Sequence, residues 1–175
     1  MYALSGRPAS TLFLPTPVPR PMATGISERL RELGITLPPP PRPAGTYRPV
    51  VVDGDHAYVS GQVPHIDGKP LHPGVVGRTV DVAQAQQAAA QAALQALSAL
   101  AAELGTLDRV RRVVRVAVYI AATPEFTQHA DVGNGATELL IRIFGEDGRP
   151  ARVSMGASSL PLGASVEVEL LVRLG

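Results

Sequence analysis

The sequence predicts an α+β domain, with two helices packed on one face of a sheet. Two stretches carry this prediction: an alanine-rich segment with leucines at helical spacing, and a β-branched run in which valines alternate. The 175 residues suit one domain with a tail. Aromatic residues make up only 4%, so the core must be built from Ala, Val and Leu, which favours small-residue helices lying close on a sheet.

Prolines shape the N-terminal part of the chain. They occupy every second position from Pro15 to Pro21, which favours an extended segment because proline fixes φ and removes a backbone donor. We expect residues 1–25 to be a disordered Pro-rich tail, with Met22 a candidate functional start and a proline-binding partner as the alternative role. The folded domain would span residues 26–175, beginning with a short helix that Gly34 ends.

A hairpin is expected after the proline-rich spacer that ends at Pro43. Its strands are Val50–Val52 and His56–Ser60, joined by a turn at Asp53-Gly54. A long helix should then run over Thr79–Leu104, with Thr79 as its N-cap and Gly105 as its terminator.

The second half repeats this alternation of strand and helix. Arg109–Ala121 is expected as a strand in which Val114, Val116, Val118 and Ile120 share one face. Pro124 opens a second helical region that ends near Phe144. The glycines in "VGNGA" predict a break around 133–135, before a firmer helix over Ala136–Phe144.

Two strands complete the predicted order ββαβαββ, one around Val153 and one over Ser165–Leu174. In the last strand, alternate apolar residues suit a floor under the helices. The opposite side mixes Glu167 and Glu169 with Leu171, and the middle strand has a similar mixed side. We expect this face to be either exposed to solvent or a polar interface between subunits.

Composition excludes several classes of function. The formal net charge of +1 gives no bulk electrostatic case for nucleic acid or an anionic membrane. The absence of cysteine removes disulfides and thiolate chemistry and fits a cytoplasmic protein. No apolar run reaches the ~18–20 residues that span a bilayer. The four histidines lack metal-ligand spacing, and we read the arginines of "RVRRVVR" mainly as strand-edge and interface charge.

Several polar residues are candidates for a site, each with a structural alternative. Arg152 offers a planar fork suited to a carboxylate, or else makes a surface or interface salt bridge. Glu167 is a candidate for positioning water or relaying protons, or is a solvated strand residue. Tyr47 could donate its hydroxyl to a ligand, or simply pack. Ser60-Gly61 could bring backbone groups close to a ligand, or end a strand in an ordinary turn. Asn134 could offer its side-chain amide to a ligand, or form a tight turn.

The chain resembles the RidA/YjgF reactive-intermediate deaminase superfamily, the enamine/imine deaminases formerly called L-PSP endoribonucleases. The resemblance lies in "GTYRPVVVDGDHAYVSGQVP", "LDRVRRVVRVAVYI", "NGATELLIRIFG" and "PARVSMGASSLPLGASVEVELLV" and extends over Ile26–Leu174. Val153 departs from it, because typical deaminases have serine after the arginine.

The resemblance implies a chorismate-mutase-like fold and a homotrimer, with a central barrel of sheets and sites in the clefts between subunits. By motif, Arg152 matches the arginine that binds the substrate carboxylate, and Glu167 matches the glutamate near the catalytic water. Tyr47, Ser60-Gly61 and Asn134 match positions that line the pocket. No cofactor or metal is implied.

The leading hypothesis is hydrolysis of reactive 2-imino or enamine acids to 2-keto acids and ammonia, with a small carboxylate as the partner molecule. An imine carbon is already electrophilic, so the protein need only hold the carboxylate, position water and assist proton transfer. The alternative is a non-catalytic trimer that binds small carboxylates or acts as a stress-related scaffold. RNA cleavage ranks last, because the sequence shows neither paired acid/base histidines nor a basic bulk charge.

Overall fold

The computed structural model describes residues 25–43 and 45–175. Apart from Gly25, the expected tail lies outside these residues and stays a prediction. The strands are β1 (Val50–Asp53), β2 (His56–Gln62), β3 (His65–Ile66), β4 (Lys69–Pro70), β5 (Val110–Ala121), β6 (Ala151–Ala157) and β7 (Val166–Leu174). The helices are α1 (Ile26–Glu32), α2 (Val82–Leu104) and α3 (His129–Phe144), with the short 3₁₀ turns η1 (Leu107–Arg109), η2 (Gly145–Gly148) and η3 (Pro161–Gly163).

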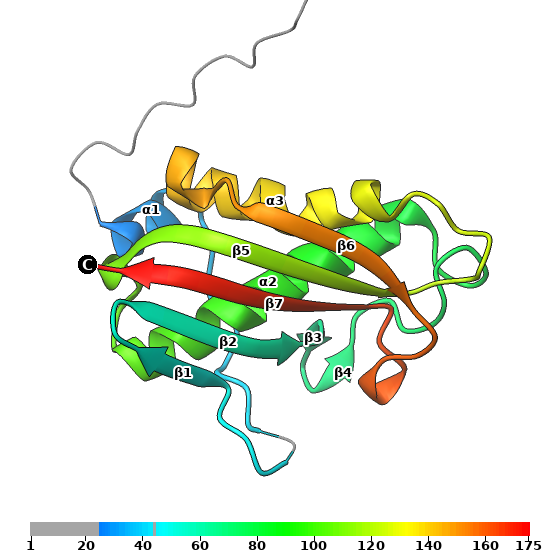
Figure 1. Ribbon diagram of the computed structural model, residues 1–175, viewed down its shortest axis with the longest axis horizontal. Coiled ribbons are helices and arrows are strands. Elements are labelled where there is room, and N and C mark those ends of the chain that lie inside the picture. Colours follow the sequence, from blue (N-terminus) through cyan, green and yellow to red (C-terminus); the bar gives the residue numbers. More distant parts are fainter. Residues whose placement is uncertain (1–24, 44) are drawn as a thin grey trace, which may run out of the picture.

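The main sheet has five strands in the order β1-β2-β7-β5-β6, and β3 and β4 form a separate two-stranded sheet. All neighbours in the main sheet are antiparallel except β5 and β6, which are parallel. Figure 1 shows α2 crossing behind β7 and β2, and α3 behind β6, so both long helices lie on one face. The predicted α+β class and the two long helices on one face are confirmed. The order ββαβαββ holds for the main sheet and these two helices, but β3 and β4 between β2 and α2 were not predicted.

The hairpin and the last strand form as predicted. Asp53 pairs with His56 across a turn in which Gly54 has φ of 59°, a left-handed conformation that glycine adopts without steric cost. In β7, the alternate residues from Val166 to Leu174 are all buried, and they form the floor on which α2 packs. The residues between them are half-buried or exposed.

The predicted apolar face of β5 is correct only in its second half. Val116, Val118 and Ile120 are fully buried, but Val113 takes the core position that the alternation assigned to Val114. The pairing of β5 with β7 shifts between Val113 and Arg115. Such a bulge inserts one residue and reverses the phase of every side chain on one side of it.

Helix α2 begins two residues later than a Thr79 cap would place it. Asp81 is the N-cap: its side chain accepts from the Gln84 backbone at 2.8 Å, and the Gln84 side chain accepts from the Asp81 backbone at 3.1 Å. This reciprocal pair satisfies two backbone donors. The Thr79 hydroxyl instead accepts from the Val75 backbone N–H at 3.0 Å. The predicted terminator is confirmed, since Gly105 is left-handed with φ of 78°.

The predicted break at Gly133–Gly135 is wrong, and α3 is continuous from His129 to Phe144. Pro124 also does not open it, because the helix starts five residues later. Both glycines allow close packing. A Cβ on Gly135 would overlap with the Gln86 carbonyl of α2, and one on Gly133 would overlap with the Ser154 hydroxyl of β6. Burial against α2 and β6 compensates for the low helix propensity of glycine, roughly 1 kcal/mol per residue.

Helix α1 is held to η1 by one carboxylate. Asp108 accepts from the Ser27 backbone at 2.8 Å and from its hydroxyl at 3.1 Å. These bonds, the backbone one first, lower the pKa of Asp108 because they favour its charged form. The predicted short helix before Gly34 is therefore real and packed on the domain.

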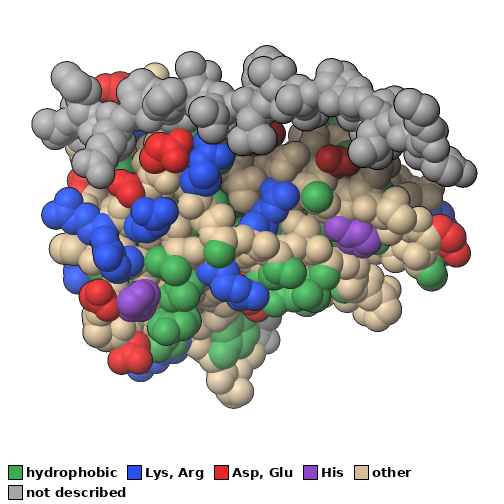
Figure 2. Space-filling model, turned by 45° about the horizontal axis from the view of Figure 1, so that its top comes forward, with side chains coloured by type: hydrophobic (Ala, Val, Ile, Leu, Met, Phe, Trp, Pro, Cys, Tyr) green, Lys and Arg blue, Asp and Glu red, His purple; other side chains and the backbone are tan. Residues whose placement is uncertain are grey.

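The surface opposite the helices is mixed in character, as expected. Exposed Val51, Tyr58 and Met155 lie among charged residues of the neighbouring strands. The tilted view of Figure 2 likewise shows apolar and basic side chains interspersed. Within the described part of the chain, no helix is both long enough and apolar enough to cross a membrane.

Candidate functional site

Arg152 is held on α3 by neutral oxygens. Its Nη1 donates to Asn134 Oδ1 at 2.8 Å and to Thr137 Oγ1 at 3.0 Å, and its Nη2 donates to the Ala130 carbonyl at 3.2 Å. None of the carboxylates in the described residues forms an ion pair with it. The guanidinium is therefore fixed in orientation, no acidic side chain of the described residues compensates its charge, and its Nε–H donates no hydrogen bond among these residues.

Gly133 makes this arrangement possible. A Cβ at this position would lie 3.2 Å from Cζ of Arg152 and 3.3 Å from its Nε, in addition to the overlap with Ser154. The guanidinium thus rests directly on the helix backbone. Asn134 and Thr137 lie three residues apart, on one face of a continuous helix, so the unbroken α3 is what brings both onto Arg152.

Glu167 lies against a glycine as well, but no group among the described residues donates a hydrogen bond to its carboxylate. A Cβ on Gly61 would overlap with the Glu167 carboxylate, so any larger residue at this position would push the carboxylate aside. Burial raises the pKa of Glu167, and the nearby charge of Glu169 raises it further. Glu169 has a donor of its own, the Tyr119 hydroxyl at 3.1 Å.

A groove of about 1160 Å³ brings Glu167 together with most of the other predicted residues. Tyr47, Ser60 and Gly61 all line it. The Ser60 hydroxyl donates to the Arg48 carbonyl at 2.8 Å, so this side chain fixes the loop that carries Tyr47. The remaining walls come from residues 36–42, from β3 and from α2.

Arg152 and Glu167 lie on opposite faces of the sheet. Arg152 is in register with buried Val116, on the side that α3 covers. Glu167 is in register with Tyr119 and alternates with buried Val166 and Val168, so it points the other way. Within one chain, the predicted residues therefore form two groups: Arg152 with Asn134, and Glu167 with Tyr47, Ser60 and Gly61.

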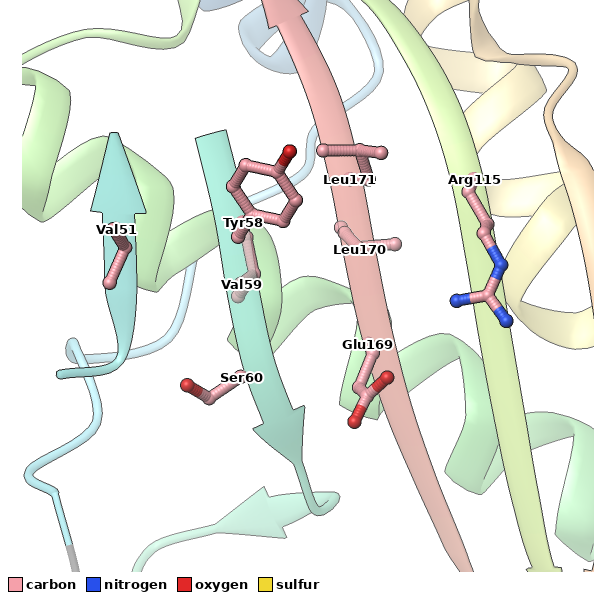
Figure 3. A pocket seen from close by; sticks show the side chains of 8 residues that line it. All are labelled: Val51, Tyr58, Val59, Ser60, Arg115, Glu169, Leu170 and Leu171. Atoms are coloured by element: carbon pink, nitrogen blue, oxygen red, sulfur yellow. The ribbon is translucent and has the colours of Figure 1, made fainter. Parts of the chain in front are cut away.

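A smaller hollow of about 270 Å³ lies on the open face of the sheet. Figure 3 shows its lining on β1, β2, β7 and β5, with Tyr58 and Leu171 at one end and Ser60 and Glu169 at the other. Arg115 lies beside Glu169 on the neighbouring strand. This is the mixed face expected from the sequence.

Sequence reasoning missed two features of the site. Thr137 was overlooked because the helix was expected to break at the glycines; an uninterrupted helix would have placed it one turn from Asn134. The apolar walls of the groove were missed because they come from segments far apart in the chain. Among the described residues, no cluster of three or more His, Asp or Glu side chains is suited to hold a metal ion.

Known proteins resemble this chain over nearly the whole domain. Protein TCP17 of Trypanosoma cruzi is 43% identical over 150 residues, which cover 85% of this chain and 94% of that protein. The structure of the protein Atu1372 of unknown function from Agrobacterium tumefaciens is 43% identical, with a TM-score of 0.79 over 86% of this chain and 93% of that one. The structure of a "putative endoribonuclease" from Shewanella oneidensis is 30% identical, with a TM-score of 0.83; the match covers 86% of this chain and 100% of that one.

A family model described as "YjgF/chorismate mutase-like, putative endoribonuclease" matches residues 27–174. This span runs from α1 to the end of β7 and includes both groups of site residues. The chain therefore belongs to the YjgF/RidA family.

Proposed function

We propose that this protein hydrolyses 2-imino or enamine acids to 2-keto acids and ammonia. The observation that carries the proposal is Arg152, a guanidinium oriented by neutral oxygens at 2.8–3.2 Å with no acidic partner among the described residues. Such a cation suits a ligand carboxylate, because a bidentate pair would supply the missing negative charge.

Glu167 suits the proton transfers that the reaction needs. Water adds to the electrophilic C2 of the imine and loses a proton to the Glu167 carboxylate, which passes it to nitrogen to give a carbinolamine. Glu167 then takes the hydroxyl proton of the carbinolamine and delivers it to the same nitrogen, the C–N bond breaks, and ammonia leaves as the C=O bond forms. A raised pKa makes Glu167 a stronger base than an ordinary glutamate. Gly61 and Tyr47 lie in the same groove, where they would contact the substrate.

The placement of the two groups on opposite faces supports a site shared between subunits. In a homotrimer, Arg152 and Asn134 of one subunit would face Glu167 and Tyr47 of the next. The exposed apolar residues Val51, Tyr58 and Met155 on the open face give the sheets a reason to associate into a central barrel.

Val153 does not weaken the carboxylate anchor in this arrangement. It is in register with Ala117 and follows Arg152 in an extended strand, so it points to the opposite face. A hydroxyl there would not reach the α3 oxygens that hold the guanidinium.

The test is release of 2-keto acid when the protein is added to an amino-acid oxidase reaction that generates imines. Acceleration over the spontaneous rate is expected, and no acceleration at any imine would overturn the proposal. Binding of 2-keto acids without turnover would favour the non-catalytic alternative. Cleavage of RNA with no effect on imines would favour the endoribonuclease activity that gave the family its older name.

A mixing experiment tests the shared site. Arg152→Ala and Glu167→Gln should each be inactive alone. Subunits co-expressed in equal amounts should regain activity, since about one site in four of a cyclic trimer would combine an intact Arg152 with an intact Glu167. Separately purified variants mixed without subunit exchange are the control. No recovery in confirmed mixed oligomers would overturn the proposal that Arg152 of one subunit and Glu167 of the next share a site.

A further inference from the structure

We propose that the groove beside Glu167 binds the substrate side chain and selects 2-imino acids with large apolar side chains, branched or aromatic. This inference rests on the proposed function and deepens it. The groove continues directly from Gly61 and Glu167. A substrate with its imine carbon at Glu167 therefore has its side chain beside the groove walls.

One wall is a rigid apolar segment. It comprises residues 36–42, with Leu37, Pro38, Pro39 and Pro41 on the groove. The Ser98 hydroxyl of α2 donates to the Pro38 carbonyl at 2.6 Å and holds the segment against the helix. Because proline restricts the backbone, this wall is formed before a ligand arrives, and binding need not order it.

On the α2 wall, the side-chain NH2 groups of two glutamines already donate hydrogen bonds. Gln91 and Gln95 both donate from Nε2 to the His65 carbonyl, at 2.9 and 3.1 Å, and so tie β3 to α2. Leu94 lies between them in sequence and also lines the groove. Leu94 therefore adds apolar surface to this wall beside glutamine amides whose NH2 groups are already bonded.

Two exposed apolar side chains complete the groove. Leu162 is 71% exposed and Ile66 is 49% exposed, although both are large and aliphatic. Leu162 also adopts a left-handed backbone with φ of 58°, which is unfavourable for a residue with a Cβ. A ligand side chain lying along the groove would remove this apolar surface from water.

The volume of the groove and the charged residues that line it limit which substrate side chains it can bind. A volume of about 1160 Å³ far exceeds what a methyl group occupies, and each further buried methylene is worth up to about fourfold in kcat/KM. Asp67 and Glu167 line the groove and repel a side-chain carboxylate, whereas Arg42 attracts one. An acidic imine is therefore the sharpest competitor in the test.

The experiment compares kcat/KM for imines generated from leucine, phenylalanine, alanine and glutamate. We expect kcat/KM for the leucine and phenylalanine imines to be at least tenfold higher than for the alanine imine. The leucine side chain has about three more carbons to bury than the alanine side chain, and the phenylalanine side chain has more still. Equal rates for leucine and alanine, or preference for the glutamate imine, would overturn the inference while leaving the proposed function intact.

Leu162→Asn is the matched variant, because asparagine tolerates the left-handed backbone and lacks the apolar side chain. The ratio of leucine to alanine kcat/KM should fall about tenfold. Val52→Thr is the control: Val52 is 42% exposed, lies outside the groove and is isosteric with threonine. An unchanged ratio in Leu162→Asn, with the fold intact by circular dichroism, would remove the groove from side-chain recognition.

Calorimetry separates failure of the reaction from failure of the groove. If no imine is hydrolysed, binding of 4-methyl-2-oxopentanoate is compared with binding of pyruvate. Tighter binding of the larger acid, lost in Leu162→Asn, would preserve the groove assignment without catalysis. Equal binding, or binding of neither, would overturn it.

Discussion

Arg152 and Glu167 both lie against a glycine, but their charges have opposite surroundings. The guanidinium donates to three neutral oxygens of α3, so it is charged and oriented. Within the described part of the chain, the Glu167 carboxylate accepts no hydrogen bond that would favour its charged form, and burial, followed by the charge of Glu169, raises its pKa. The first arrangement suits an anchor that stays fixed, and the second suits a group that must take up and release a proton.

The contrast also shows how stability and function diverge in one molecule. Hydrogen bonds to Arg152 stabilise both the fold and the proposed anchor. Ionised Glu167 is instead unfavourable in the folded state, as residues at functional sites often are. Removing each charge should therefore have different effects on activity and on stability.

The largest expected effect is on turnover in Glu167→Gln. The glutamine amide has nearly the same shape as the carboxylate it replaces. The variant therefore loses the proton acceptor but keeps the shape of the groove. We expect kcat for the leucine imine to fall by about 10²–10⁴. Glu169→Gln is the control: it also removes a carboxylate, but one already paired with Tyr119. Equal losses in both variants would assign the effect to the shared charge rather than to proton transfer by Glu167.

The second-largest loss of activity is expected for Gly61→Ala. The new Cβ would overlap with the Glu167 carboxylate and force it aside, whereas the backbone at Gly61 has no positive φ. A displacement of about 1 Å can cost up to 10²-fold, so we expect a loss approaching that of Glu167→Gln with a native circular dichroism spectrum. Full activity in Gly61→Ala would show that the carboxylate position is not critical.

Arg152→Lys tests the anchor. Lysine keeps the charge but cannot hold Asn134 and Thr137 while also gripping a carboxylate with two parallel donors. A charge-assisted pair is worth about 1.5–3 kcal/mol, so kcat/KM should fall about 10- to 100-fold, mainly through KM. Light scattering should show unchanged assembly. The reverse result, normal deamination with weakened assembly, would make Arg152 a structural ion-pairing residue.

The smallest effect is thermal. The pKa of Glu167 is raised in the folded state, so the protonated carboxyl favours folding. This contribution to the free energy of unfolding is fully present below the pKa of the unfolded chain and is lost as the pH rises through the folded-state pKa. Glu167→Gln should thus melt on the order of 1–2 °C above wild type at neutral pH, and the gap should close in acid. A variant less stable at neutral pH would mean that ionised Glu167 has a stabilising partner in the assembled protein.

Local patterns were sufficient for most of the sheet. The turn at Gly54 and the alternation in β7 depend on neighbours within a few residues, and both formed as predicted. The predicted start of α2 failed for a local reason, because Asp81 rather than Thr79 pairs with Gln84 in a capping box. The prediction for β5 failed because of a distant segment. Val113 replaced Val114 in the core because β7 pairs with β5 through a bulge, and no property of the β5 sequence alone specifies that bulge.

The candidate site shows the same division. The sequence identified Arg152, Glu167 and Gly61 as polar or permissive residues in apolar strands, because such exceptions stand out against a periodic pattern. It did not identify Thr137 or Leu162, which become relevant only through contacts with β6 or with the groove.

By itself, the sequence determined the order of elements, the buried side of β7 and the chemical types available for a site. Period and composition specify these locally. Only the tertiary structure decided that the glycines of α3 lie within a helix, that Arg152 and Glu167 face opposite ways, and that an apolar groove adjoins the carboxylate. Each of these depends on which distant segment supplies the neighbouring atoms, and that is set by the packing of helices and strands rather than by local propensity.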